Sequence, residues 1–464
     1  MNSVGDFFAA EDLYPDLDVD RAVSHLSDAI RCRTVNNADH SLTDFSEFER
    51  LHALIKKSFP SVMEYGIFEL IGHSVLITLP GSDPTLLPCL YMSHQDVVPV
   101  VLGTEQNWTY DAFSGAVADG YIWGRGTLDI KDMVFGILEA AEYLLTHGRQ
   151  FRRTAYLAFG DDEETLNQGA LSIAETLKSR GVQLEFLLDE GGGEIEDGAA
   201  FGAPGVNISL INLMEKGYAD LELSVESAGG HSSCPWGGSS LERLARAITA
   251  ITGHPFPPRM PEPLLATFET LAPFITEEPL RSLVQDVHAN SGAIAACCLE
   301  RKETFPYVTT TIAPTMIEGG SSACNVLPQN MRAVINFRLN RGETVESVMA
   351  HCRSVVQDES VSLRFLQANS PSAVARFDGS GYSWLTEALS VFYPGVLFVP
   401  ALTTGATDAR QYECICDTCL RCSPFMAEPD DVLTGVHGTN ERIPIRSYAQ
   451  GIRVLIRLME LANL

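Results

Sequence analysis

The stretch Leu90-Tyr-Met-Ser-His-Gln-Asp-Val-Val-Pro99 contains the end of a short apolar run and the polar turn that follows it. The run, 86–92, carries no charge, so we expect a buried strand of a parallel sheet. In open α/β sheets, ligands bind beyond the carboxyl ends of such strands. His94 and Asp96 stand at this end. A His-x-Asp pair alone is more typical of a hydrogen-bonded loop, so a metal site requires that other strands end in similar side chains.

Two further apolar segments end in acidic clusters. Residues 154–159 precede Gly160-Asp-Asp-Glu-Glu164, and residues 184–188 precede Asp189-Glu-Gly-Gly-Gly193. Consecutive carboxylates repel one another unless cations or solvent neutralise them, although acidic runs also occur on ordinary surfaces. Asp129 lies just ahead of a helix expected over 131–147, where an N-cap is the simpler interpretation. The repetition of such clusters at strand ends, rather than any one motif, indicates a metal centre.

The order of the expected elements predicts two domains in this chain of 464 residues. These elements include a helix at about 45–58 and strands at about 62–69, 74–79 and 330–339. From residue 218 the strands alternate apolar and polar residues, which is typical of a sheet with one solvated face. We expect residues 216–368 to form an inserted α+β domain. Residues 1–215 and 369–464 are expected to form an α/β domain with a mixed, mostly parallel sheet flanked by helices.

The composition excludes several classes of partner. A formal net charge of −28 argues against nucleic acid or an anionic membrane as a partner. The simpler interpretation of this charge is that it keeps the protein soluble. No apolar run of 18 residues is present, and the acidic residues 1–20 do not resemble a secretion signal. The 11 cysteines, an odd number, favour reduced thiols over a disulfide framework. We therefore expect a cytoplasmic protein.

The motifs together resemble those of one family. His94-Gln-Asp96, Gly124-Arg-Gly-Thr-Leu-Asp129, Asp162-Glu-Glu164, Leu188-Asp-Glu-Gly, Gly230-His-Ser-Ser, Asn325-Val-Leu-Pro and Gly435-Val-His437 occur in the order found in the M20 metallopeptidases. The wording of residues 93–100 and 119–129 is most similar to the branch of carboxypeptidase S and the N-acyl-amino-acid hydrolases. The resemblance covers nearly the whole chain.

This resemblance implies a two-zinc centre, for which Co²⁺ or Mn²⁺ are alternatives. One ion would be bound by His94, Asp129 and Asp189, and the other by Asp129, Glu164 and His437, with Asp129 bridging. The remaining catalytic roles implied by the family fall on Asp96 (orienting the His94 ring), Glu163 (general base) and His231 (stabilising the oxyanion). His231 belongs to the insert, which in some relatives forms a homodimer and presents this histidine to the partner's site. Here the insert is longer, at about 255–303, so supply within the chain and supply to a partner both stay open.

The resemblance also implies how a substrate carboxylate is bound. Arg410, in Gly405-Ala-Thr-Asp-Ala-Arg, matches the family position for this group, and a guanidinium suits a planar carboxylate. Asn325 and Arg338 are further candidates, with a structural salt bridge as the alternative for Arg338. Gly405 would let backbone amides approach the substrate.

Two features depart from the family pattern. Ile130 follows Asp129 where close relatives often have aspartate, but this position is not a ligand. Cys414, Cys416, Cys419 and Cys422 have the spacing of a metal site, yet they fall on an expected strand, where alternate residues face opposite ways. We interpret them as reduced thiols in the core, with a structural metal as the alternative.

The leading hypothesis is a metal-dependent hydrolase that releases a carboxyl-terminal amino acid from short peptides or N-acyl amino acids. An aminoacylase or other small-molecule deacylase with the same centre is a second enzyme hypothesis. A binding protein on a degenerate peptidase fold is the third, and the presence of every expected ligand together with Glu163 argues against it.

Overall fold

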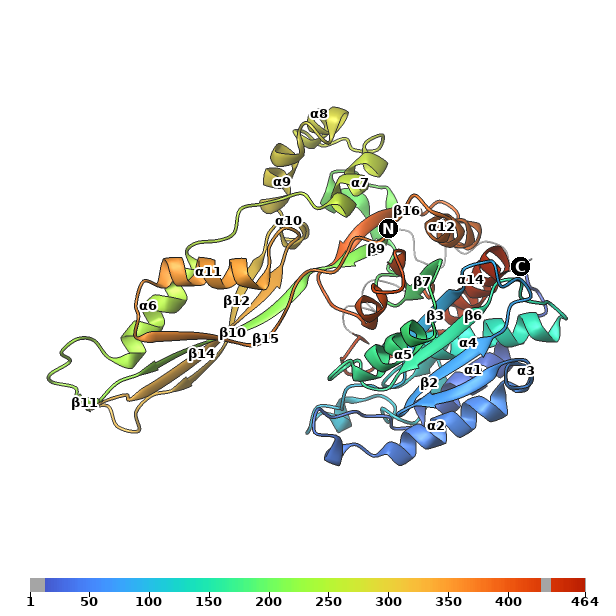
Figure 1. The fold of residues 1–464 in the computed structure, drawn as a ribbon, viewed down its shortest axis with the longest axis horizontal. Helices are drawn as coiled ribbons and strands as arrows, with labels where there is room; N and C mark the ends of the chain where they lie inside the picture. Colours follow the sequence, from blue (N-terminus) through green and yellow to red (C-terminus); the bar gives the residue numbers. More distant parts are fainter. Residues whose placement is uncertain (1–12, 427–434, 464) are drawn as a thin grey trace.

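The computed structural model describes residues 13–426 and 435–463, and its two largest sheets are separate, each with its own helices (Figure 1). The larger sheet is mixed and has helices on both faces, as expected for the α/β domain. Its strands, in spatial order, are β1 (Ile67–Ile71), β2 (Ser74–Leu79), β6 (Ala155–Gly160), β3 (Cys89–His94), β7 (Phe186–Asp189), β17 (Cys419–Arg421), β9 (Asn207–Glu215) and β16 (Leu397–Thr403), with β8 (Glu196–Asp197) paired to β9.

The centre of this sheet is parallel. Strand β3 pairs in parallel with β6 and β7, and β7 pairs in parallel with β17. His94 is in register with Gly160, and Asp189 with Arg421. Since parallel strands end at the same edge, the turns after β3, β6 and β7 meet there. The three clusters identified in the sequence therefore share one edge of the sheet.

Strand β3 is buried along its whole length because both of its faces are covered. Cys89 and Tyr91 point to one hydrophobic core, and Leu90 and Met92 point to the other. The second core includes α5 (Gln168–Ser179). The first is covered by a larger group of helices: α1 (Val19–Ile30), α2 (Phe45–Ser58), α3 (Pro60–Tyr65), α4 (Lys131–Thr146), α12 (Ser380–Phe392) and α14 (Ile445–Asn463).

A small three-stranded sheet lies beside this domain, in the order β18 (Arg442–Pro444), β5 (Tyr121–Trp123) and β4 (Ala116–Ala118). It pairs the segment after His437 with the segment before Asp129. Two loops that carry expected ligands, far apart in the sequence, are thus brought side by side.

The insert has a four-stranded antiparallel sheet that extends away from the larger domain (Figure 1). Helices α6 (Ser240–Thr252) and α11 (Val345–Val356) pack on it and share its hydrophobic core. A two-stranded ribbon of β11 (Gly230–His231) and β13 (Val326–Leu327) lies at its outer end. The sheet strands, in spatial order, are β12 (Thr311–Gly319), β14 (Asn330–Leu339), β10 (Gly217–Glu226) and β15 (Val361–Asn369).

Two segments differ from the sequence expectation. Residues 62–69 were expected to be a strand, but Pro60 begins helix α3 and Glu142 accepts hydrogen bonds from the backbone N–H of Ser61 and Val62. Residues 262–308, expected within the insert, pack instead against β9 and β16 of the larger sheet. Their apolar side chains join Phe201, Ile208 and Val399 in one core. These residues form α7 (Glu262–Leu271), α8 (Leu280–Leu283), α9 (Ser291–Leu299) and α10 (Phe305–Val308).

Candidate metal centre

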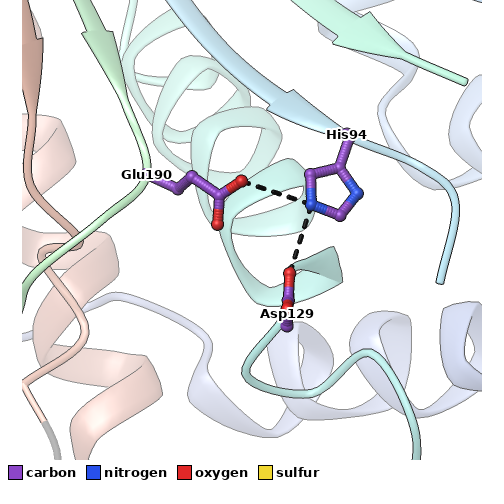
Figure 2. Close-up of side chains that lie close together, drawn as sticks. All are labelled: His94, Asp129 and Glu190. Carbon is purple, nitrogen blue, oxygen red and sulfur yellow. Dashed lines mark hydrogen bonds and ion pairs between the residues drawn. The ribbon is translucent and has the colours of Figure 1, made fainter. Parts of the chain in front are cut away.

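The first group of ligand-type side chains surrounds His94, the last residue of β3 (Figure 2). Its Nε2 lies 3.2 Å from Oδ1 of Asp129 and 3.3 Å from Oε1 of Glu190. The three ligand atoms lie within 4.8 Å of one another, which is close enough to hold one metal ion. Asp129 comes from the turn before α4 and Glu190 from the turn after β7.

The second group shares Asp129 with the first. Nε2 of His437 lies 2.8 Å from Oδ2 of Asp129 and 3.0 Å from Oε1 of Glu164. The two oxygens of the Asp129 carboxylate therefore face two different imidazoles, His94 and His437. A carboxylate in this position can bridge a pair of ions.

Asp189, an expected ligand, is not in the first group, and its Oδ2 accepts a hydrogen bond of 2.8 Å from the backbone N–H of Ala409. Successive side chains of an extended chain point in opposite directions, so the neighbouring Glu190 faces His94 instead. The sequence run Asp189-Glu-Gly contained this signal, but nothing in it decided between the two carboxylates.

Asp96 contacts residues of both groups. Its Oδ1 lies 3.3 Å from Nδ1 of His94, and the His94 Nδ1 also lies 3.0 Å from the Asp96 carbonyl oxygen. The same carboxylate accepts hydrogen bonds of 3.1 Å from the backbone N–H of Glu163 and of Glu164. One buried side chain thus fixes the ring of His94 and the backbone at Glu163 and Glu164.

The electrostatics of the site suit a cation. Burial lowers the pKa of His94, but Glu190, Asp129 and Asp96 outweigh it and raise that pKa well above its ordinary value. Hydrogen bonds to Asp129 and Glu164 raise the pKa of His437 to about 10. Burial, together with the charges of Glu190, Asp408 and Glu164, raises the pKa of Glu163 well above its usual range. The excess of carboxylates holds protons on both imidazoles, and divalent ions bound by these nitrogen and oxygen donors would take their place.

The expected carboxylate-binding residues lie at the junction between the two sheets. Arg410 donates to Oδ1 of Asn369 at 3.0 Å and to the Ser370 carbonyl at 2.9 Å. Arg338 donates to the Thr404 carbonyl at 3.3 Å and stacks over the ring of Tyr218. Gly405 lies in the exposed loop between β16 and Arg410. None of the three reaches the two candidate metal groups by a contact within the described residues.

His231 and Asn325 lie together at the outer end of the insert (Figure 1). The Asn325 carbonyl accepts a hydrogen bond of 2.9 Å from the backbone N–H of Ser232. Nδ1 of His231 lies 2.8 Å from the Ser233 hydroxyl, and the side chain is exposed. The structure therefore brings these two residues to each other and not to the metal groups of the same chain.

A cavity of about 420 Å³ adjoins the first metal group. Asp129 and Glu190 form part of its wall. The rest is largely apolar or glycine, with two further carboxyl groups: Leu128, Ile130, Asp132, Gly191, Gly192, Gly193, Glu194, Ser423, Phe425 and Val436. A volume of this size is typical of small-molecule sites.

The four cysteines of the cluster lie in different surroundings, and Cys422, whose backbone N–H donates to the Asp189 carbonyl, belongs to the core on the other face of the sheet. Cys416 and Cys419 are buried in the core beneath α5, and Cys414 is exposed. Neither group of candidate metal ligands in the described part of the chain contains a cysteine. All 11 cysteines are free thiols.

Comparison with known proteins assigns the family. The model of peptidase family M20/M25/M40 matches residues 90–461. The chain belongs to this family. It is 34% identical to the N-fatty-acyl-amino acid synthase/hydrolase PM20D1.1 of Danio rerio, over 93% of this chain and 84% of the relative. It is 32% identical to the probable carboxypeptidase S-like 2 of Dictyostelium discoideum, over 87% and 77%.

Solved structures agree on the fold. The M20 family metallo-carboxypeptidase Sso-CP2 from Sulfolobus solfataricus superposes with a TM-score of 0.68 at 18% identity, covering 95% of this chain and 99% of that one. The resemblance to the M20 metallopeptidases is thus confirmed, and with it a metal-dependent amide hydrolase. No helix in the described ranges is long and apolar enough to span a bilayer.

Proposed function

We propose that this protein hydrolyses the amide bond of N-acyl amino acids and short peptides at a two-zinc centre and releases the carboxyl-terminal amino acid. The observation that carries the proposal is the Asp129 carboxylate, whose two oxygens face His94 and His437. One ion is assigned to His94, Asp129 and Glu190, and the other to Asp129, Glu164 and His437. Co²⁺ and Mn²⁺ suit the same donors.

Glu163 is proposed as the general base. When bound, the ions polarise the attacking water and the scissile carbonyl. Glu163 takes a proton from that water and returns it to the departing amine nitrogen. The Asp96 carboxylate supports this role because it holds the backbone N–H of Glu163 and the ring of His94 at the same time.

We propose that Arg410 and Arg338 bind the substrate carboxylate and that Gly405 lies beside it. Asn325 would join this site in the homodimer proposed below. Arg338 has no carboxylate within ion-pair distance among the described residues. Arg410 lies 3.7 Å from Oε2 of Glu215 and makes its shorter hydrogen bonds to neutral oxygens. Arg338 is therefore the cation better suited to accept an anionic group, and Arg410 would share its charge between Glu215 and the substrate. In this arrangement the released amino acid lies toward the two arginines. The acyl or amino-terminal part of the substrate lies on the other side of the metal centre.

His231 is proposed to act across a homodimer formed by the insert, 216–368. Its position at the outer end of the insert supports supply to a partner's site rather than its own. Strand β12 lies at the edge of the insert sheet and is exposed from Ala313 to Gly319, with Met316 and Ile317 at 49% and 62% exposure. Unpaired apolar edge strands of this kind pair with another chain.

The test is a substrate panel with zinc-reconstituted protein. Dipeptides, N-acetyl amino acids and long-chain N-acyl amino acids are incubated in parallel, and released amino acids are identified by mass spectrometry. Release from peptides supports a carboxypeptidase, and release from acyl substrates alone supports the deacylase alternative, which the Danio rerio relative favours. No release from any substrate would leave a non-catalytic binding protein, and release unaffected by chelation would contradict a metal-dependent reaction.

We also assign the protein to the cytoplasm. The 11 free cysteines, several of them exposed, support a reducing compartment.

A further inference from the structure

We propose that Glu441 and Arg125 are positioning residues that hold the Asp129 loop and the His437 loop in register, so that the two metal sites form as a unit. Neither residue is expected to touch metal or substrate. The inference rests on the proposed two-metal centre, and it concerns how this chain builds that centre from segments about 300 residues apart.

Glu441 holds the backbone that carries the bridging ligand. Its Oε1 accepts hydrogen bonds from three amides of this turn, those of Gly126 and Leu128 at 2.9 Å and that of Asp129 at 3.3 Å. The side chain is completely buried. Three backbone N–H groups that have no helix or strand partner therefore donate to a single carboxylate oxygen. These hydrogen bonds fix the position of the Asp129 backbone.

Arg125 connects this carboxylate to the other loop. Its Nη1 donates to Oε2 of Glu441, and its Nη2 donates to the carbonyls of His437 and Gly438 at 3.0 and 3.1 Å. The guanidinium is 2% exposed. A planar fork can make both sets of bonds at once, whereas the compact ammonium of lysine cannot. The pair thus forms an unbroken path from the His437 backbone to the Asp129 amide.

The His437 loop needs such a clamp. His437 and Asn440 both have positive φ angles, 58° and 66°, which residues other than glycine seldom adopt. The loop packs on residues 107–129: Oδ1 of Asn440 accepts from the Thr109 amide at 2.7 Å, and the Glu441 carbonyl accepts from the Gly124 amide at 2.9 Å. The His437 side chain is half exposed, so its position depends on its backbone. The Glu441–Arg125 pair provides the buried part of that support.

Loss of either residue is expected to lower metal affinity first, and turnover only as a result. Loss of a group that orients a metal ligand typically lowers affinity 10- to 100-fold. Glu441→Gln keeps an oxygen for the three amides but loses the charge that pairs with Arg125. Arg125→Lys keeps the charge but loses the fork that reaches the His437 carbonyl. Both variants should weaken zinc binding, above all for the ion assigned to Asp129, Glu164 and His437.

The experiment is calorimetric titration of Zn²⁺ into the metal-free full chain, with thermal unfolding of the same metal-free samples. Glu142→Gln is the matched control, since Glu142 is also buried and accepts from two backbone amides, those of Ser61 and Val62, but belongs to neither metal group. We expect Glu441→Gln and Arg125→Lys to lose 10- to 100-fold in affinity for at least one ion. Glu142→Gln should lower the unfolding temperature without changing zinc affinity.

The outcomes separate the inference from the proposed function. If the wild-type chain binds fewer than two zinc ions, the two-metal centre itself fails. If it binds two and both variants match the wild type or Glu142→Gln in affinity, the positioning role is overturned. If Glu441→Gln does not fold, the milder Arg125→Lys decides, because it keeps the buried positive charge. As a further readout, restoring activity to Arg125→Lys with excess zinc, at unchanged KM for substrate, supports positioning.

Discussion

The metal centre and the outer end of the insert differ in how firmly each is held. At the metal centre, His94, Asp96 and Asp129 each make several polar contacts and are shielded from solvent to a large extent. At the end of the insert, His231 lies on a ribbon of two short strands, Asn325 directly precedes the second of them, and Trp236 is 95% exposed. The side chains of the first region are held by contacts within one chain. Those of the second region are exposed, as is typical of a surface that binds a partner.

The largest expected effect is at the metal centre. Glu163→Gln should lower kcat by about 10²- to 10⁴-fold, because the amide cannot take the proton of the attacking water. Zinc affinity should stay near that of the wild type, since Glu163 belongs to neither ligand group. Steady-state kinetics and calorimetry on the same sample check this. A variant that loses zinc along with activity would place Glu163 among the ligands instead.

The contrast between the two regions is tested directly by His231. His231→Ala should lower kcat by about 10²- to 10³-fold, as is typical when one oxyanion donor is removed. If the histidine serves the partner's site, mixing inactive His231→Ala and Glu163→Gln chains should restore roughly one quarter of wild-type activity, because mixed dimers keep one intact site.

That mixing experiment requires subunit exchange, which mass photometry or native mass spectrometry verifies. The matched control mixes Glu163→Gln with Glu164→Gln, two changes in the same site of each chain, and should restore nothing. Equal activity in both mixtures, or a monomer at working concentration, would contradict supply of His231 from the partner.

A smaller effect distinguishes two adjacent carboxylates. Glu190→Gln should weaken zinc binding by at least about 10-fold, since its Oε1 lies beside the Nε2 of His94. Asp189→Asn should weaken it less, because Asp189 is engaged with the Ala409 amide and an asparagine oxygen can still accept that bond. Zinc titration of both metal-free variants decides. A larger loss in Asp189→Asn would restore the ligand assignment expected from the sequence.

The sequence predicted the parts of the fold that depend on regular periodicity. Helix 45–58 and strands 74–79 and 330–339 match the structure in both bounds. The convergence of His94, Asp129, Glu164 and His437 followed from strand ends and family motifs. Choosing Glu190 over Asp189 needed side-chain direction at a turn, which periodicity does not encode. The packing of 262–308 on β9 and β16 is a long-range contact between amphipathic helices and a sheet edge, and either sheet offered an apolar surface.

The smallest effect lies at the junction of the two regions, at Lys216. Its Nζ is buried and donates to the carbonyls of Pro306 and Thr309, at 2.7 and 2.6 Å. Burial, and then the charge of Arg338, lower its pKa to about 7. The unfolded chain keeps this proton up to the ordinary lysine range, so above pH 7 it binds more protons than the folded protein. The free energy of unfolding of the wild type should therefore rise with pH relative to Lys216→Met, by up to about 1.4 kcal/mol per unit between pH 7 and 9.

Urea unfolding at both pH values measures this difference, with the exposed Lys302→Met as control. Equal differences at pH 7 and 9 would show that Lys216 stays charged when buried, with its proton held by the two carbonyl partners.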